Sequence, residues 1–156
     1  MLSVLGAVFV SVQQLLHIYT GYTVYRVFLV LCLQRSFRGV EIAFEEPVQI
    51  SVESVASRAS RFKPRGVDVA VALLLATGNE DTYVISYTKN GAELVDLHLT
   101  FTASSLHRVR ITAYSSLENL DTESRNTLLG TVARLLKRIH IDPRVLGVLY
   151  PDHSCG

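Results

Sequence analysis

The chain has 156 residues, of which 49% are apolar, and its 15 basic and 14 acidic side chains leave a net charge of +1. This length predicts about one domain with a hydrophobic core of its own. The near-neutral charge argues against a nucleic-acid-binding protein, whose binding face is usually strongly basic. The two cysteines, Cys32 and Cys155, form neither a disulfide framework nor a zinc-binding pattern.

The first 34 residues differ in composition from the rest of the chain. They contain 23 apolar residues and one charge, Arg26, whereas the other 122 residues carry 14 basic and 14 acidic side chains. Arg26 is costly inside a bilayer, and no Lys or Arg precedes it as a secretory signal requires. We predict an apolar extension at 1–40, followed by a domain at 47–156. Residues 2–33 are either a membrane anchor or a segment joined to the domain by faulty gene prediction.

The first half of the domain combines strand-like and helix-like patterns. Residues 48–52 alternate apolar and polar side chains, which predicts a half-buried strand. Residues 67–76 show both an alternation and a helical stripe, and Pro64 before them and Gly78 after them favour a helix. Strands are predicted at 82–87 and 94–103, with a turn at 89–91 between them.

The second half contains the clearest helix of the sequence. After a predicted strand at 109–113, Asp121 or Thr122 can cap a helix whose apolar residues repeat at helical spacing from 128 to 139. Asp142-Pro143 ends this helix, and the apolar run at 145–150 predicts a last strand. The order strand, helix, strand thus occurs twice. It predicts an α/β fold, a pseudo-duplicated βαβ two-layer sandwich with both helices on one sheet face.

This order of elements, together with two local strings, resembles the macrophage migration inhibitory factor (MIF) and D-dopachrome tautomerase branch of the tautomerase superfamily. One string is 76–79 (Ala-Thr-Gly-Asn), which runs into the predicted strand at 83–85. The other is 128–145, with its Ile-Asp-Pro break followed by Arg-Val. The resemblance runs from Pro47 to about Tyr150. It implies a homotrimer, a cell-surface receptor as partner, keto–enol tautomerase chemistry and no cofactor.

The resemblance assigns the catalytic base to Pro47. The family uses the free amine of an N-terminal proline, because a secondary amine in an apolar pocket accepts a proton near neutral pH. In this chain Pro47 follows Glu46 through a peptide bond, so its nitrogen is a non-basic amide. Only a cut between these two residues restores the base.

The other pocket positions depart from the family pattern. Asn79 stands where the family has a lysine that holds the substrate carboxylate, and Ser115-Ser116 stand where it has Ser-Ile. Leu146 and Val148 correspond to the family's pocket tyrosine and asparagine. Substrate contacts are therefore expected only at Asn79, Ser115 and Ser116, in a degraded pocket.

Three functions compete on this basis. The first is a MIF-like, cytokine-like interaction protein that is not an enzyme as the chain is written. It would trimerise through an edge strand at 94–101. The second is an isomerase, a keto–enol tautomerase of the phenylpyruvate or dopachrome type, active after exposure of Pro47. The third is a membrane-tethered α/β domain of unknown role.

Location and metal binding are less constrained. The chain is expected to be cytoplasmic, or secreted without a standard signal peptide, with membrane anchoring as the alternative. His98 and His107 lack an acidic or thiol partner that would complete a metal site, so no metal is expected. The basic residues between 58 and 65 are predicted to form a solvated loop.

Overall fold

The computed structural model describes residues 8–11, 25–31, 37–61 and 63–149. Its strands are β1 (Val8–Ser11), β2 (Tyr25–Leu31), β3 (Phe37–Gln49), β4 (Asp68–Ala76), β5 (Asp81–Lys89), β6 (Ala92–Thr102) and β7 (Ser105–Tyr114). Its α-helices are α1 (Val52–Ala59), α2 (Thr122–Arg138) and α3 (Leu146–Leu149), and its 3₁₀ helices are η1 (Ser115–Asn119) and η2 (Pro143–Val145).

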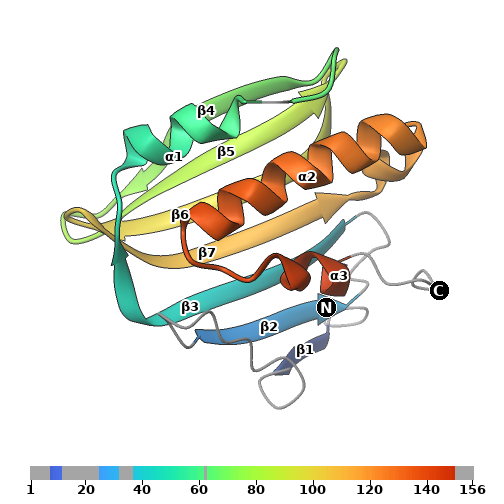
Figure 1. Ribbon diagram of the computed structural model, residues 1–156. Coiled ribbons are helices and arrows are strands. Elements are labelled where there is room, and N and C mark those ends of the chain that lie inside the picture. The colour runs from blue at the N-terminus through green and yellow to red at the C-terminus, as the bar shows by residue number, and fades with distance from the viewer. Residues whose placement is uncertain (1–7, 12–24, 32–36, 62, 150–156) are drawn as a thin grey trace.

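The described strands form one sheet in the order β1-β2-β3-β7-β6-β5-β4, in which each neighbouring pair is antiparallel. Helices α1 and α2 lie side by side on the same face of this sheet (Figure 1). The predicted two-layer α/β sandwich with helices on one face is therefore confirmed. The predicted βαβ repeat does not occur among these strands, because a βαβ unit joins parallel strands.

The segment predicted as a helix at 67–76 is strand β4, so that prediction is wrong. β4 pairs antiparallel with β5, and the two are joined by a turn in which Gly78 has a φ of +90°. The segment is apolar at almost every position, so a helical stripe and a strand alternation both fit it. Gly78 closes a hairpin here instead of a helix.

The strand predicted at 48–52 is also displaced. β3 ends at Gln49, and Val52 is the first residue of α1. Ser51 caps this helix, because its hydroxyl accepts a hydrogen bond from the Ser54 backbone N–H at 3.1 Å. The basic loop predicted from residue 58 therefore begins inside a helix, and α1 ends at Ala59.

The last strand, predicted at 145–150, is wrong as far as the structure describes it. Asp142 caps η2, which begins at Pro143, and α3 follows directly from Leu146 to Leu149. A proline at the first position of a helical turn is favourable, because it has no N–H to leave unpaired there. The apolar run is instead a short helix that packs against the core through Leu149.

The other predicted elements are confirmed. Strands β5 and β7 contain the strands predicted at 82–87 and 109–113, and β6 contains the one predicted at 94–103 except for Ala103, which begins the following turn. Asn90 and Gly91 both have positive φ, which is the geometry of the two-residue hairpin turn that this dipeptide favours. Asp121 caps α2 by accepting a hydrogen bond from the Ser124 backbone N–H at 2.7 Å.

The core lies between the helices and the sheet. Helix α2 contributes Leu128, Val132, Leu135 and Leu136, all of them buried. Alternate residues of the central strands face these side chains. They include Val40 and Ile42 of β3, Leu97 and Leu99 of β6, and Val109 and Ile111 of β7.

Part of the apolar N-terminal extension joins the same sheet. β2 pairs with β3, and β1 pairs with β2. β3 itself begins at Phe37, ten residues before Pro47. No helix among the described residues has the length and apolarity to cross a membrane. The remaining residues of the predicted anchor at 2–33, and both cysteines, lie outside the described part of the chain.

Candidate functional site

The structure does not bring the predicted catalytic and substrate-binding residues together. Pro47 lies exposed in β3, next to the register shift between Ala43 and Val48, and its nitrogen belongs to the Glu46–Pro47 peptide bond. Asn79 is exposed in the β4–β5 turn. Three strand spacings, about 14 Å, separate β3 from β5.

Ser115 and Ser116 lie at the opposite end of the sheet. They begin η1, directly after β7 ends at Tyr114. Val48 is paired with Leu106 near the start of β7, so the length of that strand, about 30 Å, separates these serines from Pro47. The four predicted residues therefore do not surround a common pocket.

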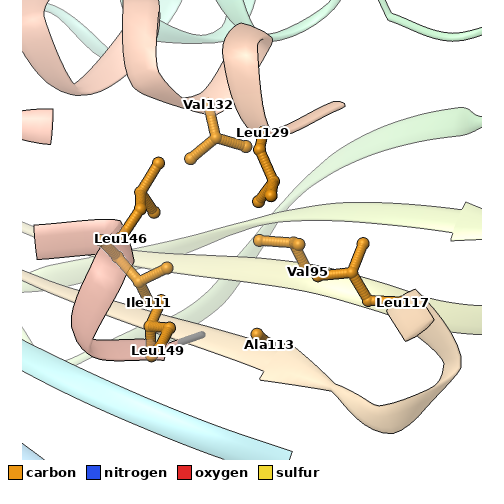
Figure 2. A pocket seen from close by; sticks show the side chains of 8 residues that line it. All are labelled: Val95, Ile111, Ala113, Leu117, Leu129, Val132, Leu146 and Leu149. Carbon is orange, nitrogen blue, oxygen red and sulfur yellow. The ribbon is translucent and has the colours of Figure 1, made fainter. Parts of the chain in front are cut away.

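Leu146, which the resemblance aligns with the family's pocket tyrosine, belongs to the apolar core. It lines a small cavity between α2, α3 and the sheet (Figure 2). The other lining residues are Val95, Ile111, Ala113, Leu117, Leu129, Val132 and Leu149. The cavity encloses about 10 Å³, enough for about one water molecule, and its lining is apolar. It is a packing void and too small for an aromatic substrate. The side chain of Val148 lies outside the described part.

A polar cluster lies on the sheet face opposite the helices. Asp96 is only 5% exposed, and its Oδ2 accepts a hydrogen bond from the Tyr114 hydroxyl at 2.8 Å. Its Oδ1 is buried and has no hydrogen-bond partner within the described structure. Burial, followed by this hydrogen bond and the charge of Asp96, raises the pKa of Tyr114. The phenol therefore remains a hydrogen-bond donor at all physiological pH values.

A β-bulge adds a second carboxyl to this cluster. The pairing of β5 with β6 shifts between Tyr87 and Thr88, and the consecutive residues Leu94 and Val95 are both buried. Because Leu94 and Val95 both point toward the core, the residues on either side of them, Glu93 and Asp96, both point to the polar face. Partial desolvation and the nearby Asp96 carboxylate raise the pKa of Glu93.

Charged residues continue along this polar face. His98 is the next residue on this face of β6, and its partner on the neighbouring strand β7 is Arg110. Arg110 donates a hydrogen bond to Glu41 of β3 at 3.1 Å. Burial lowers the pKa of His98, with Asp96 opposing the effect and Arg110 adding to it. Among the described residues no three side chains of His, Cys, Asp or Glu are close enough to hold a metal ion. His98 is paired in β6, and His107 falls where the β6–β7 register shifts.

Strand β4 is the most exposed apolar segment among the residues whose side-chain exposure the structure describes. Among the described strands it is the last of the sheet and pairs only with β5, so its other side is a free edge of the described sheet. Its large side chains Val71, Leu73, Leu74 and Leu75 are 39%, 53%, 57% and 57% exposed. Among the residues whose side-chain exposure the structure describes, 38–61 and 63–149 without Val148, they are the only large apolar residues that are exposed.

β4 is apolar on both faces of the sheet. Val69, Val71 and Leu73 pair with Tyr87, Ile85 and Tyr83, which belong to the helix-facing core, so they point to that side. Ala70 and Ala72 point to the other side, because side chains alternate along a strand. After the register shift between Leu73 and Leu75, Leu75 pairs with Thr82, whose hydroxyl lies 3.2 Å from that of Thr100 on the polar face.

A strand that is apolar on both faces is typical of positions covered on both sides, as in parallel sheets. Proteins usually protect free edges with charges, prolines or bulges. β4 has a single charge, Asp68, at its start, and one register shift near its end. The edge therefore has the composition of an internal strand at an uncovered position, and we take it as the candidate binding site.

No family model matches the chain, and no curated protein and no solved structure matches it significantly. The resemblance to the MIF branch thus stays a prediction from the sequence.

The sequence pattern at 67–76 predicts a helix, so it does not reveal β4 as a functional element. The free edge predicted at 94–101 is wrong, because β6 is paired on both sides by β5 and β7. The signal that identifies β4 is the run of eight apolar residues after Asp68, combined with its place at the end of the sheet.

Proposed function

We propose that the chain is a non-enzymatic protein-interaction module that binds an extended segment of another polypeptide along β4. The observation that supports this function is the exposed apolar edge. Backbone N–H and C=O groups on the free side of β4 can pair with an added strand, which gives affinity. The apolar side chains on both faces of β4 select partners with apolar residues. Such strand addition covers an edge that is otherwise prone to non-specific association.

A selection experiment tests this function directly. A phage-displayed library of random dodecapeptides is selected on the full chain, and the selected peptides are titrated against it and against Leu74→Lys. We expect apolar, strand-forming peptides that lose at least tenfold in affinity for the variant, because a lysine charge is buried at the new interface. Asn119→Lys is the matched control, because Asn119 is exposed at the end of η1, away from β4. Equal binding to all three chains, or no selected peptide, contradicts the function.

The cytokine-like and tautomerase functions rest on the resemblance alone. The tautomerase function depends on a free amine at Pro47, which the chain as written does not have. Its test is phenylpyruvate or dopachrome tautomerisation by a chain that begins at Pro47, compared with the same chain carrying Pro47→Gly. Equal rates remove the proline mechanism.

A further inference from the structure

The two ends of β4 carry opposite charges. Arg61, Lys63 and Arg65 precede the strand, whereas Glu80 and Asp81 follow it, and all five residues are exposed. The apolar strand between them has only Asp68 as a charge. The edge therefore reads, in chain order, as a basic flank, an apolar centre and an acidic flank.

We infer that β4 pairs antiparallel with β4 of a second copy of this chain and forms a twofold-symmetric dimer with one continuous sheet. This inference rests on the proposed function, since it names the partner of the same edge. Antiparallel pairing places the basic flank of each copy beside the acidic flank of the other, and it does so twice. Parallel pairing would place like charges together, which is unfavourable.

The pattern also fits residue by residue. When the pair is centred on Ala72, Leu73, Leu74 and Leu75 of one copy lie opposite Val71, Ala70 and Val69 of the other. Lys63 and Arg65 of one copy then lie at the same end of the joined strands as Glu80 of the other copy, which belongs to the β4–β5 turn. Asp68 lies opposite Ala76, so no like charges meet across the pair.

An edge that pairs with itself closes the assembly at two copies, because each chain uses the same surface. The strand is about 30 Å long, and its apolar side chains gain apolar cross-strand neighbours on each face of the continuous sheet. This dimer differs from the homotrimer that the family resemblance implies.

Analytical ultracentrifugation of the full chain over a range of concentrations tests the dimer. We expect a monomer–dimer equilibrium, and Leu74→Lys should weaken it at least tenfold while Asn119→Lys leaves it unchanged. Both positions are exposed, so we expect circular dichroism to show that both variants remain folded.

A charge-reversal pair tests the antiparallel arrangement itself. One chain carries Arg61→Glu and Arg65→Glu, and the other carries Glu80→Lys and Asp81→Lys. Lys63 is kept because its Nζ donates a hydrogen bond to the Val67 carbonyl at 2.7 Å. The Glu80–Arg108 pair is long, 3.9 Å, and half exposed, so its loss matters little to the fold.

Each charge-reversed chain alone should dimerise at least tenfold more weakly, and an equimolar mixture should recover dimers that contain one copy of each.

A chain that is monomeric at all concentrations overturns the inference. A trimer, or a dimer unaffected by Leu74→Lys, also overturns it. If the chain is monomeric but selected peptides still bind β4, the proposed function holds and only the second-copy partner is wrong. If neither assay responds to Leu74→Lys, both fail.

Discussion

Asp96 is held in place by a phenol on one oxygen, while its other oxygen is buried and unpaired within the described structure. A buried polar atom without a partner costs free energy. The bulge at Leu94 adds the Glu93 carboxyl to the same face, where it increases the negative charge. These residues therefore lower the stability of the fold at neutral pH.

Glu93→Gln should stabilise the protein at pH 7, because it removes a like charge beside Asp96. The expected gain is roughly 0.2–1 kcal/mol, as for other cross-strand charge pairs near water. The pKa of Glu93 is raised in the folded state, so folding favours its protonated form, and the wild type recovers stability as the pH falls through that raised pKa. The gain from the substitution should therefore shrink as the pH falls from 7 to 4.

Urea unfolding at pH 7, 5 and 4 measures this difference. Glu45→Gln is the control, since Glu45 is an exposed carboxyl in β3. A gain that is the same at all three pH values, or that also occurs for Glu45→Gln, would show that Asp96 is not its cause.

At the scale of elements, the sequence predicts two long helices, and only one of them forms, for a physical reason. Helix α2 was predicted correctly because its apolar residues lie on one face only, so only the helical period fits them. β4 is apolar on both faces, so its pattern fits a helix and a strand equally well. Its strand pairing depends on β5, a contact that no local pattern contains.

Helix α1 and the polar cluster were missed for related reasons. α1 has eight residues and buries only Val55 and Ala59, which is too few for a periodic signal. Glu93 meets Asp96 only because a bulge changes the alternation of β6. The predicted site residues rest on the family resemblance. The sheet places Ser115 and Ser116 at the end opposite to Pro47 and Asn79, and these last two lie on different strands of the other end.

The N-cap of α2 gives a prediction at the same scale. Hydrogen bonds from the backbone N–H and the side chain of Ser124 lower the pKa of Asp121. The cap therefore stabilises the fold above the ordinary carboxyl pKa, and this stabilisation is lost as the pH falls through the lowered pKa. Asp121→Ala should lower the urea midpoint at pH 7 by about half a molar.

Asp121→Asn is the matched variant, because its side-chain oxygen still caps the helix but does not titrate. Its midpoint should lie close to that of the wild type at pH 7. The difference between wild type and Asp121→Ala should narrow toward pH 3, whereas that between the Asn and Ala variants should not. A difference between wild type and Asp121→Ala that does not depend on pH would mean that the carboxylate charge has no part in the cap.

On the scale of the whole molecule, one sheet has two unlike faces and an exposed apolar edge at β4. Helices α1 and α2 cover one face (Figure 1), and the other face carries the polar cluster around Asp96. At the β4 edge the apolar side chains are exposed. The described surface thus has two distinctive features, and they lie on different strands. One is the polar cluster around Asp96 on β6, and the other is the exposed apolar edge at β4.

The exposed edge should also control aggregation independently of stability. Leu75 is more than half exposed, so Leu75→Lys should change the free energy of unfolding by less than about 0.5 kcal/mol. The added charge nevertheless interrupts the apolar run of β4, which is the kind of segment that drives edge-to-edge association. We therefore expect the variant to aggregate more slowly at high concentration.

Static light scattering during incubation at 37 °C measures aggregation, and urea unfolding measures stability, so the two effects are separated. Asn119→Lys is the control for added charge. If both lysine variants slow aggregation equally, net charge is the cause and the β4 edge is not.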